Sequence, residues 1–361
     1  MTLAELRRRA CSRTLFAPRD LAGAVAKLGF VQIDPLRAPA RAQDLILRHR
    51  VEGYRAGDLD RAYRGLGLVE DFLHVHGVLP AASRRLLHPR AVERTWHVER
   101  EHPELAQRIV DFIARNGPTH PKALHAAFGR HAVVNGWGGR SVATTRLLEV
   151  LHYRGNLHVS HRADGIKVYA IATPIARPLG PRARAVGVLD LLLRLYAPLP
   201  VASLRELARM AADASFDAAQ RERLIESFVR RDAVARARVD GVEYLWPADD
   251  PDPGPLGDDV RLLAPFDPLV WDRRRFAHLH GWDYRFEAYT PASRRRFGYY
   301  ALPLLWRDRV IGWANVARRS GELEIRTGFT AHAPRGRPFA RALGAEIQRL
   351  ETFLAVPAQA P

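Results

Sequence analysis

The residues best suited to chemistry are a polar pair in the stretch Val31-Gln32-Ile33-Asp34-Pro35. In an extended strand, residues i and i+2 point to the same side, so Gln32 and Asp34 are expected to present an amide and a carboxylate side by side. Pro35 cannot donate a ladder hydrogen bond, which would leave Asp34 at the end of the strand. Such a pair can hold a water molecule and stabilise positive charge developing on a sugar ring, as hydrolysis of an N-glycosidic bond requires.

From spacing alone, a polar pair at a strand end without a catalytic role is the ordinary explanation, and other catalytic signatures are absent from the sequence. There is no phosphate-binding P-loop, no dinucleotide-binding glycine fingerprint and no Gly-x-Ser-x-Gly nucleophile motif. Cys11 is the single cysteine, which excludes an internal disulfide and a cysteine-based zinc site. His74 and His76 could face the same side of a strand, but without the ligand cluster of a typical metal site. We therefore expect no metal and no cofactor.

The chain is strongly basic. Its 361 residues include 56 Lys and Arg against 39 Asp and Glu, for a formal net charge of +17, and only three of the basic residues are lysines. A GC-rich genome would explain the preference for arginine but not the sign of the charge. This excess is typical of a protein that binds a polyanion, and nucleic acid is the predicted partner.

The sequence contains no membrane or export signal. No apolar run approaches the roughly 18 to 20 residues that span a bilayer. The N-terminus begins with a charged helical pattern over residues 3–13 rather than with a signal peptide. We expect a cytoplasmic protein, associated with the nucleoid, that has no membrane partner.

The elements that would position the polar pair recur in one order: helices, then two extended segments joined by a tight turn. In the clearest copy, within residues 105–172, an Asp-Gly turn separates two alternating runs, which is a strong hairpin signal. A second copy lies within 184–246, and a third, less regular one begins at the N-terminus. Helix-turn-helix followed by a hairpin is the order of a winged helix. The predicted fold class is α+β: winged helices over 1–95 (with the Gln-Ile-Asp stretch), 96–178 and 184–247, then a small β-barrel and terminal helix over 248–361.

The C-terminal region changes to short strands after a Pro- and Gly-rich linker at 247–259. Close turns between these strands favour a small sheet or partial barrel, and a basic amphipathic helix is predicted over 339–354. Arg294-Arg295-Arg296 would lie in a basic hairpin directed at DNA, although a solvated turn that protects a strand edge is the alternative. The predicted strands are 282–290, 297–305, 309–316 and 322–327.

Two blocks of the sequence resemble the YcaQ-like and AlkZ-like winged-helix DNA glycosylases. Residues 28–35, Leu-Gly-Phe-Val-Gln-Ile-Asp-Pro, resemble that family's Gln-Φ-Asp motif, in which Φ is apolar. Residues 265–275, Pro-Phe-Asp-Pro-Leu-Val-Trp-Asp-Arg-Arg-Arg, resemble its most recognisable block, and 284–291 and 298–303 continue it. The family also carries the same residue at Gly136, Trp137, Tyr169, Glu70, His74 and Pro80. The resemblance covers nearly the whole chain.

The resemblance implies three winged helices around a C-terminal β-barrel and a monofunctional DNA glycosylase. Its implied reaction is hydrolysis of the bond between deoxyribose and N7-alkylguanine in double-stranded DNA, which unhooks interstrand crosslinks or bulky adducts without a metal or a strand-cleaving step. Asp34 would position water and stabilise the cationic sugar, and Gln32 would help hold the water or nucleotide. We expect a monomer. Contacts to DNA are expected from Arg37, Arg41, His74, Trp137, Arg140, Arg294, Arg295 and Arg296.

Four segments depart from the family's usual residues and leave the substrate range open. A narrow self-resistance enzyme, a broad crosslink enzyme and an inactive DNA-binding paralogue are all compatible with them. The alternative function is a non-catalytic winged-helix DNA-binding protein or transcriptional regulator, which would read base edges with a recognition helix and would not need the pair at 32 and 34. The departures are at residues 41–44 (Arg-Ala-Gln-Asp), 71–74 (Asp-Phe-Leu-His), 138–140 (Gly-Gly-Arg) and 315–319 (Asn-Val-Ala-Arg-Arg).

Overall fold

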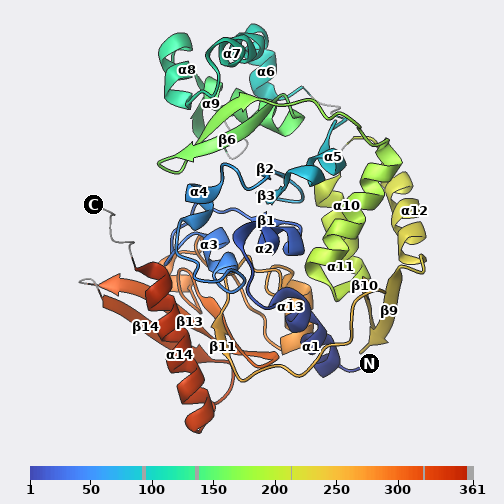
Figure 1. Ribbon diagram of the computed structural model, residues 1–361, viewed down its shortest axis with the longest axis vertical. Helices are drawn as coiled ribbons and strands as arrows, with labels where there is room; N and C mark the ends of the chain where they lie inside the picture. Colours follow the sequence, from blue (N-terminus) through green and yellow to red (C-terminus); the bar gives the residue numbers. More distant parts are fainter. Residues whose placement is uncertain (92–94, 135–137, 213, 320–321, 356–361) are drawn as a thin grey trace. The chain divides into compact units, whose positions relative to one another are not determined.

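The computed structural model describes residues 1–91, 95–134, 138–212, 214–319 and 322–355 (Figure 1). Trp137, one of the expected DNA contacts, lies outside these ranges. The chain forms two compact units, each built from separated stretches. Unit 1 contains residues 1–59, 189–207 and 225–361, and unit 2 contains residues 60–188 and 208–224.

Helices and antiparallel strands are both abundant, so the fold is mixed α and β, as predicted. The helices are α1 (Leu3–Thr14), α2 (Leu21–Leu28), α3 (Ala42–Leu47), α4 (Asp58–Ala62), α5 (Arg84–Leu87), α6 (His97–Glu101), α7 (Pro103–Asn116), α8 (Pro121–Phe128), α9 (Ala143–Arg154), α10 (Pro181–Tyr196), α11 (Val201–Ala211), α12 (Ala218–Val229), α13 (Arg273–His280) and α14 (Arg337–Leu354). The strands are β1 (Val31–Gln32), β2 (Leu68–Phe72), β3 (His76–Pro80), β4 (Ala132–Val134), β5 (Arg140–Val142), β6 (Leu157–Ala163), β7 (Ile166–Ile171), β8 (Leu199–Pro200), β9 (Val234–Val239), β10 (Val242–Pro247), β11 (Val260–Leu262), β12 (Leu302–Trp306), β13 (Arg309–Arg319) and β14 (Glu322–Phe329).

In unit 2, helices α7, α8 and α9 pack with the β6–β7 hairpin, which confirms the elements predicted for this region. Apolar residues at helical spacing, including Ile109, Ile113, Leu147 and Leu151, meet in one buried core with residues of the hairpin. The hairpin turns at Asp164 and Gly165, both with positive φ, as an Asp-Gly turn requires.

In unit 1, the predicted hairpin after α12 is also present, because β9 and β10 pair antiparallel around the turn at Asp240 and Gly241. Strand β8 joins them on the other edge of β10. The segment 248–259 between β10 and β11 contains no helix or strand, as its prolines and glycines predicted.

The C-terminal sheet of unit 1 is an open half-barrel of four antiparallel strands in the order β11-β12-β13-β14, with α14 alongside (Figure 1). This half-barrel agrees with the small sheet or partial barrel predicted for the region. It differs in its strands, because the segment 282–301, in which two predicted strands begin, is irregular.

The basic hairpin predicted around the three arginines is also wrong. Residues 282–289 form no strand, Ala292–Arg294 form a single 3₁₀ turn, and β12 begins only at Leu302. The cause is the buried carboxylate of Glu287, which accepts the backbone N–H groups of Arg296 (2.9 Å), Phe297 (2.7 Å) and Gly298 (3.2 Å). The backbone N–H groups of residues 296–298 would have bonded a neighbouring strand, but the Glu287 side chain accepts them instead.

Candidate active site

The polar pair follows directly from the end of helix α2 in unit 1. Asp20 caps the start of this helix by accepting the N–H of Gly23 at 2.7 Å. The helix ends at Gly29, whose φ of 77° favours glycine, and a Cβ there would lie 2.5 Å from the Leu191 side chain. The next two residues are buried, and the strand β1 ends at Gln32 instead of continuing to Asp34 as predicted.

The amide of Gln32 is oriented by a residue far away in the sequence. Trp271 donates its indole Nε1–H to Oε1 of Gln32 at 2.9 Å. Because the amide oxygen is bonded in this way, the amide nitrogen, a donor, is directed to the other side of the group.

Asp34 is a half-buried carboxylate with few bonds of its own. Its Oδ1 accepts the backbone N–H of Leu36 at 2.9 Å, the geometry of an Asx turn, and its backbone N–H points to Oε1 of Gln43 at 3.4 Å. Within the described residues no Lys, Arg or His forms an ion pair with it. Burial raises the pKa of Asp34 above its usual value, and the hydrogen bond from Leu36 offsets part of that rise.

A tyrosine that the sequence reasoning did not single out belongs to the same site. Tyr300 is only 4% exposed, and among the described residues its buried hydroxyl has no hydrogen-bond partner. Its ring packs edge-on against Phe286 at 5.3 Å between centroids. Burial, and next the negative charge of Asp34, raise the pKa of Tyr300 well above its usual range, so the phenol is neutral. Its place in the Gly-Tyr-Tyr block at 298–300 was the signal that could have identified it.

A buried ion pair holds the polypeptide around Trp271 in register with the N-terminal segment. Arg50 donates to both carboxylate oxygens of Asp267, at 2.8 and 3.0 Å, and both side chains are 0% exposed. Arg50 also donates to the carbonyl oxygens of Thr14 and Ile46, each at 2.7 Å. Because all three guanidinium nitrogens of Arg50 are hydrogen-bonded, the pair can persist in the interior and fix the geometry.

Asp272 and Arg275 of the 265–275 block are structural as well. Asp272 caps α13 by accepting the N–H groups of Arg274 and Arg275, at 3.1 and 3.2 Å. The buried Arg275 donates to the carbonyl oxygens of Tyr196 and Pro268. The block is thus the scaffold that presents Trp271 to Gln32.

The expected DNA-binding residues are placed very differently from one another. Arg37, Arg140, Arg294 and Arg296 are exposed, and Arg41 and Arg295 are partly buried. Arg295 donates to the Thr290 carbonyl at 2.7 Å and lies over the ring of Tyr299. His74 is 7% exposed, and burial lowers its pKa to about 3. It therefore presents little surface and no charge, although its role in binding stays a prediction.

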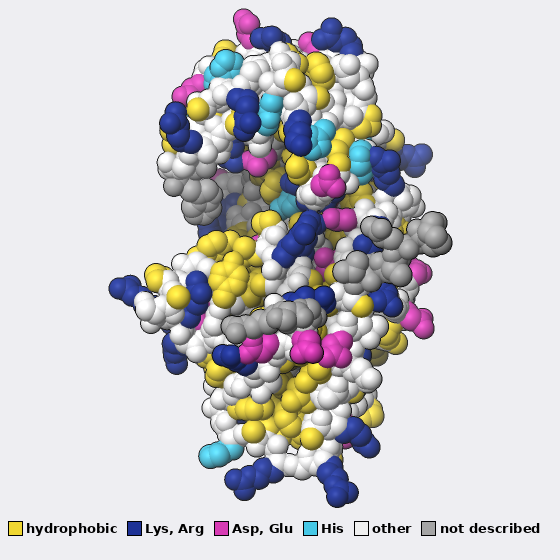
Figure 2. All heavy atoms as spheres, turned by 90° about the vertical axis from the view of Figure 1, so that its left-hand side faces the viewer, with side chains coloured by type: hydrophobic (Ala, Val, Ile, Leu, Met, Phe, Trp, Pro, Cys, Tyr) yellow, Lys and Arg dark blue, Asp and Glu magenta, His cyan; other side chains and the backbone are white. Residues whose placement is uncertain are grey.

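On the face drawn in Figure 2, the described positive side chains do not gather in one continuous patch. Lys and Arg side chains there are interspersed with apolar and acidic ones. The net charge therefore does not by itself locate a path for DNA. Among the described residues, no cluster of three or more His, Cys, Asp and Glu side chains could hold a metal ion. None of the helices described here combines the length and apolar character that crossing a bilayer requires.

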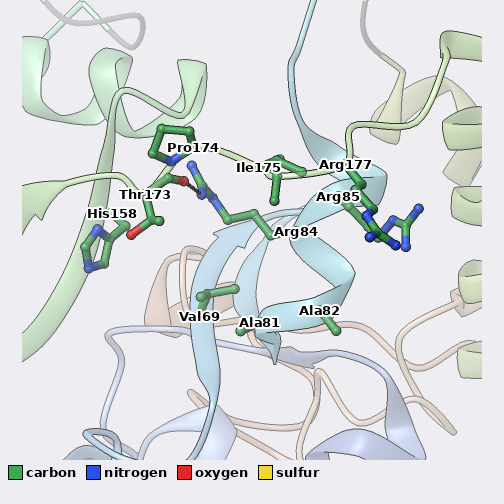
Figure 3. A pocket seen from close by; sticks show the side chains of 11 residues that line it. Val69, Ala81, Ala82, Arg84, Arg85, His158, Thr173, Pro174, Ile175 and Arg177 are labelled. Carbon is green, nitrogen blue, oxygen red and sulfur yellow. Dashed lines mark hydrogen bonds between the residues drawn. The ribbon is translucent and has the colours of Figure 1, made fainter.

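Unit 2 carries a pocket of about 480 Å³ that does not include the polar pair (Figure 3). Its apolar lining includes Val69, Ala81 and Ile175. Arg84 extends into it and donates to the Thr173 carbonyl at 2.6 Å. Arg85 and Arg177 also line it.

The comparisons with known proteins agree with the resemblance seen in the sequence. The family model described as DNA glycosylase AlkZ-like matches residues 25–353. The solved structure of Streptomyces sahachiroi DNA glycosylase AlkZ is similar with a TM-score of 0.63 and 14% sequence identity, over 98% of this chain and 96% of that one. At that identity the structural likeness shows the fold, while the family model extends across both units. The chain belongs to the AlkZ-like family of DNA glycosylases.

Proposed function

We propose that this protein hydrolyses the N-glycosidic bond of N7-alkylguanine in double-stranded DNA, with Asp34 and Gln32 as its catalytic residues. The observation that carries the proposal is the state of Asp34: a half-buried carboxylate that no cation of the described residues neutralises, close to an amide held in place by Trp271. A carboxylate retained in this environment has a raised pKa and full capacity to interact with a positive charge, as catalytic groups often do.

The proposed mechanism follows from the bond that breaks, the glycosidic bond between deoxyribose and guanine. The C1′–N9 bond cleaves with its electron pair moving to the base, and positive charge develops on the sugar. The Asp34 carboxylate stabilises that charge electrostatically and accepts a hydrogen bond from the attacking water. Water oxygen bonds to C1′, and its proton leaves through the carboxylate to solvent. Gln32, whose amide nitrogen is free to donate, holds the water or the nucleotide.

An N7-alkylated base needs little assistance to leave. Alkylation gives the guanine a positive charge, which the electron pair of the broken bond neutralises, so protonation by a general acid is not required. The proposed steps therefore involve no metal ion and no cofactor.

The finer features of the proposal concern the substrate and the DNA. We propose that bulky adducts and interstrand crosslinks are substrates, that the helix-and-hairpin segments act as winged helices on duplex DNA, and that the protein works as a monomer on the nucleoid. The net charge of +17 and the helix-and-hairpin order of α7 to β7 support contact with a duplex.

The test is single-turnover excision from a duplex that carries a nitrogen-mustard crosslink or an N7-alkylguanine. The wild type should release the alkylated base and leave an abasic site. Asp34→Asn should bind the same duplex equally well but excise about 10² to 10³ times more slowly, since a charge that stabilises a cationic transition state is lost.

Excision by Asp34→Asn at the wild-type rate would overturn the role of this carboxylate. Binding without any excision by the wild type would instead favour the alternative of a non-catalytic DNA-binding protein or regulator. A strong preference for one undamaged sequence would support that alternative further.

A further inference from the structure

An aromatic side chain in the segment between α13 and β12 of unit 1 is left largely exposed to solvent. The Tyr289 side chain is 81% exposed, in the irregular segment that links α13 to β12. Aromatic rings gain free energy when they are covered, and tyrosine in particular is favoured where a partner will bury it. A ring left in water at this place is therefore available to a ligand.

The segment that carries Tyr289 is held in a defined conformation. Glu287 binds three consecutive backbone N–H groups at 296–298, and Arg295 donates to the carbonyl of Thr290. Asn315 on β13 donates to the Phe297 carbonyl at 2.7 Å. Gly298 has a φ of 119°, and a Cβ there would lie 2.2 Å from Asn315 Oδ1, so the segment sits tightly on the sheet. The ring of Tyr289 is thus presented on a preorganised support, which lowers the entropic cost of binding.

Ring contacts lead from Tyr289 to the catalytic carboxylate. Its ring packs edge-on against Phe286 at 6.2 Å, and Phe286 packs edge-on against Tyr300 at 5.3 Å. The charge of Asp34 contributes to the raised pKa of Tyr300, so the two side chains lie within electrostatic range of each other. A ligand stacked on Tyr289 would therefore lie two ring contacts away from Tyr300, on the side of unit 1 that carries Asp34.

The charges around the ring identify the ligand as nucleic acid. Arg294 and Arg296 are exposed on the same short segment. The guanidinium of Arg295 lies 5.1 Å from the ring of the neighbouring Tyr299, which is itself 43% exposed. Aromatic rings beside arginines are the combination that binds unstacked bases and their phosphates.

We propose that Tyr289 stacks on a nucleobase that loses its neighbour when the duplex opens at the damaged guanine. This inference rests on the proposed glycosylase function and adds a base-binding residue to it. Tyr289 can stack on any base, because every base has an aromatic face. It would therefore recognise a break in the base stacking of the duplex rather than a particular base sequence.

The experiment measures binding to two duplexes of equal length and sequence, one intact and one with a tetrahydrofuran abasic analogue opposite 2-aminopurine. Neither duplex can be a substrate for excision, so binding is read independently of catalysis. Dissociation constants and 2-aminopurine fluorescence are measured for the wild type, Tyr289→Phe and Tyr289→Ala. Met210→Ala, which removes a different exposed apolar side chain, is the matched control.

We expect Tyr289→Ala to lose about tenfold in affinity for the abasic duplex, within the range for one base–aromatic stack, and about twofold or less for the intact duplex. Tyr289→Phe, which keeps the ring, and Met210→Ala should bind both duplexes like the wild type. The 2-aminopurine signal of the wild-type and Phe complexes should differ from that of the Ala complex. Thermal unfolding should be the same for all four proteins.

Wild-type affinity of Tyr289→Ala for the abasic duplex would overturn the proposal. Equal losses on both duplexes would overturn it too, because they indicate a backbone contact. So would a wild type that is dimeric and a Tyr289→Ala variant that is monomeric, since the ring would then cover a second copy of the chain. Excision in the same preparations tests the glycosylase function separately: its absence, with the abasic-specific loss retained, would refute that function and leave the stacking contact standing.

Discussion

Two regions of the molecule bury carboxylates, and they do so in opposite ways. In unit 1, Asp34 is half-buried and has no cationic partner among the described residues. In unit 2, the strand β2 buries Glu70 and Asp71 in succession, and both are neutralised. Arg162 donates to the two oxygens of Glu70 at 2.7 and 2.8 Å, and His88 bonds Asp71 at 2.7 Å.

The pKa values of Asp34 and Asp71 are shifted in opposite directions. Burial alone would raise the pKa of Asp71, but the hydrogen bond and charge of His88, together with Arg90, lower it well below its usual range. Burial raises the pKa of Asp34 without such compensation. Glu70, Asp71, Arg162 and His88 form the unit 2 cluster. His152 is buried beside it, and burial lowers the pKa of His152 to about 4.

The comparison teaches that a concentration of polar residues does not identify a reactive site. The unit 2 cluster contains more titratable groups than the surroundings of Asp34, yet its charges satisfy one another and hold the β2–β3 hairpin in place. A carboxylate that the fold leaves unneutralised retains its capacity to interact with a charge that develops during a reaction. The following predictions test this distinction between a structural and a reactive carboxylate.

The largest effect is expected when a structural carboxylate is neutralised. Glu70→Gln leaves the partly buried Arg162 without its counter-charge and should lower the free energy of unfolding by about 3–5 kcal/mol. Asp34→Asn is the matched control and should leave stability unchanged or slightly higher at pH 7, because ionised Asp34 is disfavoured by burial. Urea unfolding of both variants measures this. A larger loss of stability in Asp34→Asn than in Glu70→Gln would reverse the comparison.

As the pH is lowered, excision should be lost before the protein unfolds. The ionised form of Asp34 is the proposed reactive form, so excision should fall about tenfold per pH unit as the pH drops below its raised pKa, which lies above 3.8. Asp71 has a lowered pKa in the folded state, so its contribution to stability is complete above the unfolded pKa and is lost only as the pH falls further. Single-turnover rates and circular dichroism over the same pH series should show the loss of excision first. Coincident loss of both would contradict the assignment.

Removing the bond that orients Gln32 should have a moderate effect. Trp271→Phe keeps an aromatic ring, smaller than the indole, but deletes the indole N–H, and should slow excision about two- to tenfold, the worth of one hydrogen bond. Trp306→Phe is the matched control, because its indole N–H bonds the Asp258 carbonyl at 3.2 Å near the surface, away from the polar pair. Rates measured at saturating DNA compare the two. Equal rates in both variants would show that the Gln32 orientation does not matter for excision.

The smallest effect is expected from exposed arginines. Replacing Arg294 and Arg296 by alanine should weaken binding to duplex DNA a few-fold and lower the slope of log affinity against log salt by up to about two, one for each phosphate contact. Arg307→Ala is the control, since its guanidinium is paired with Asp258 at 2.7 Å. Titrations between about 50 and 200 mM salt provide the slopes. Thermal stability should stay unchanged, and an unchanged slope would show that both arginines face solvent in the complex.

Local patterns in the sequence were enough to determine most helices and hairpins. The two Asp-Gly turns close the hairpins β6–β7 and β9–β10 as predicted, and helices precede each hairpin. Periodicity, caps and turns act over a few residues, so one stretch of sequence contains the information that determines them. The Gln-Ile-Asp stretch and the family resemblance were visible for the same reason.

Only the tertiary structure decided what surrounds that stretch. Trp271 and Tyr300 reach the polar pair from more than two hundred residues away, and the burial of His74 arises from packing that its neighbours in sequence do not reveal. The segment 282–301 has the composition of strands, yet Glu287 takes its backbone donors and keeps it out of the sheet. Side chains that compete for backbone hydrogen bonds, and contacts between distant segments, depend on where the whole chain places them. Local propensity therefore could not predict them.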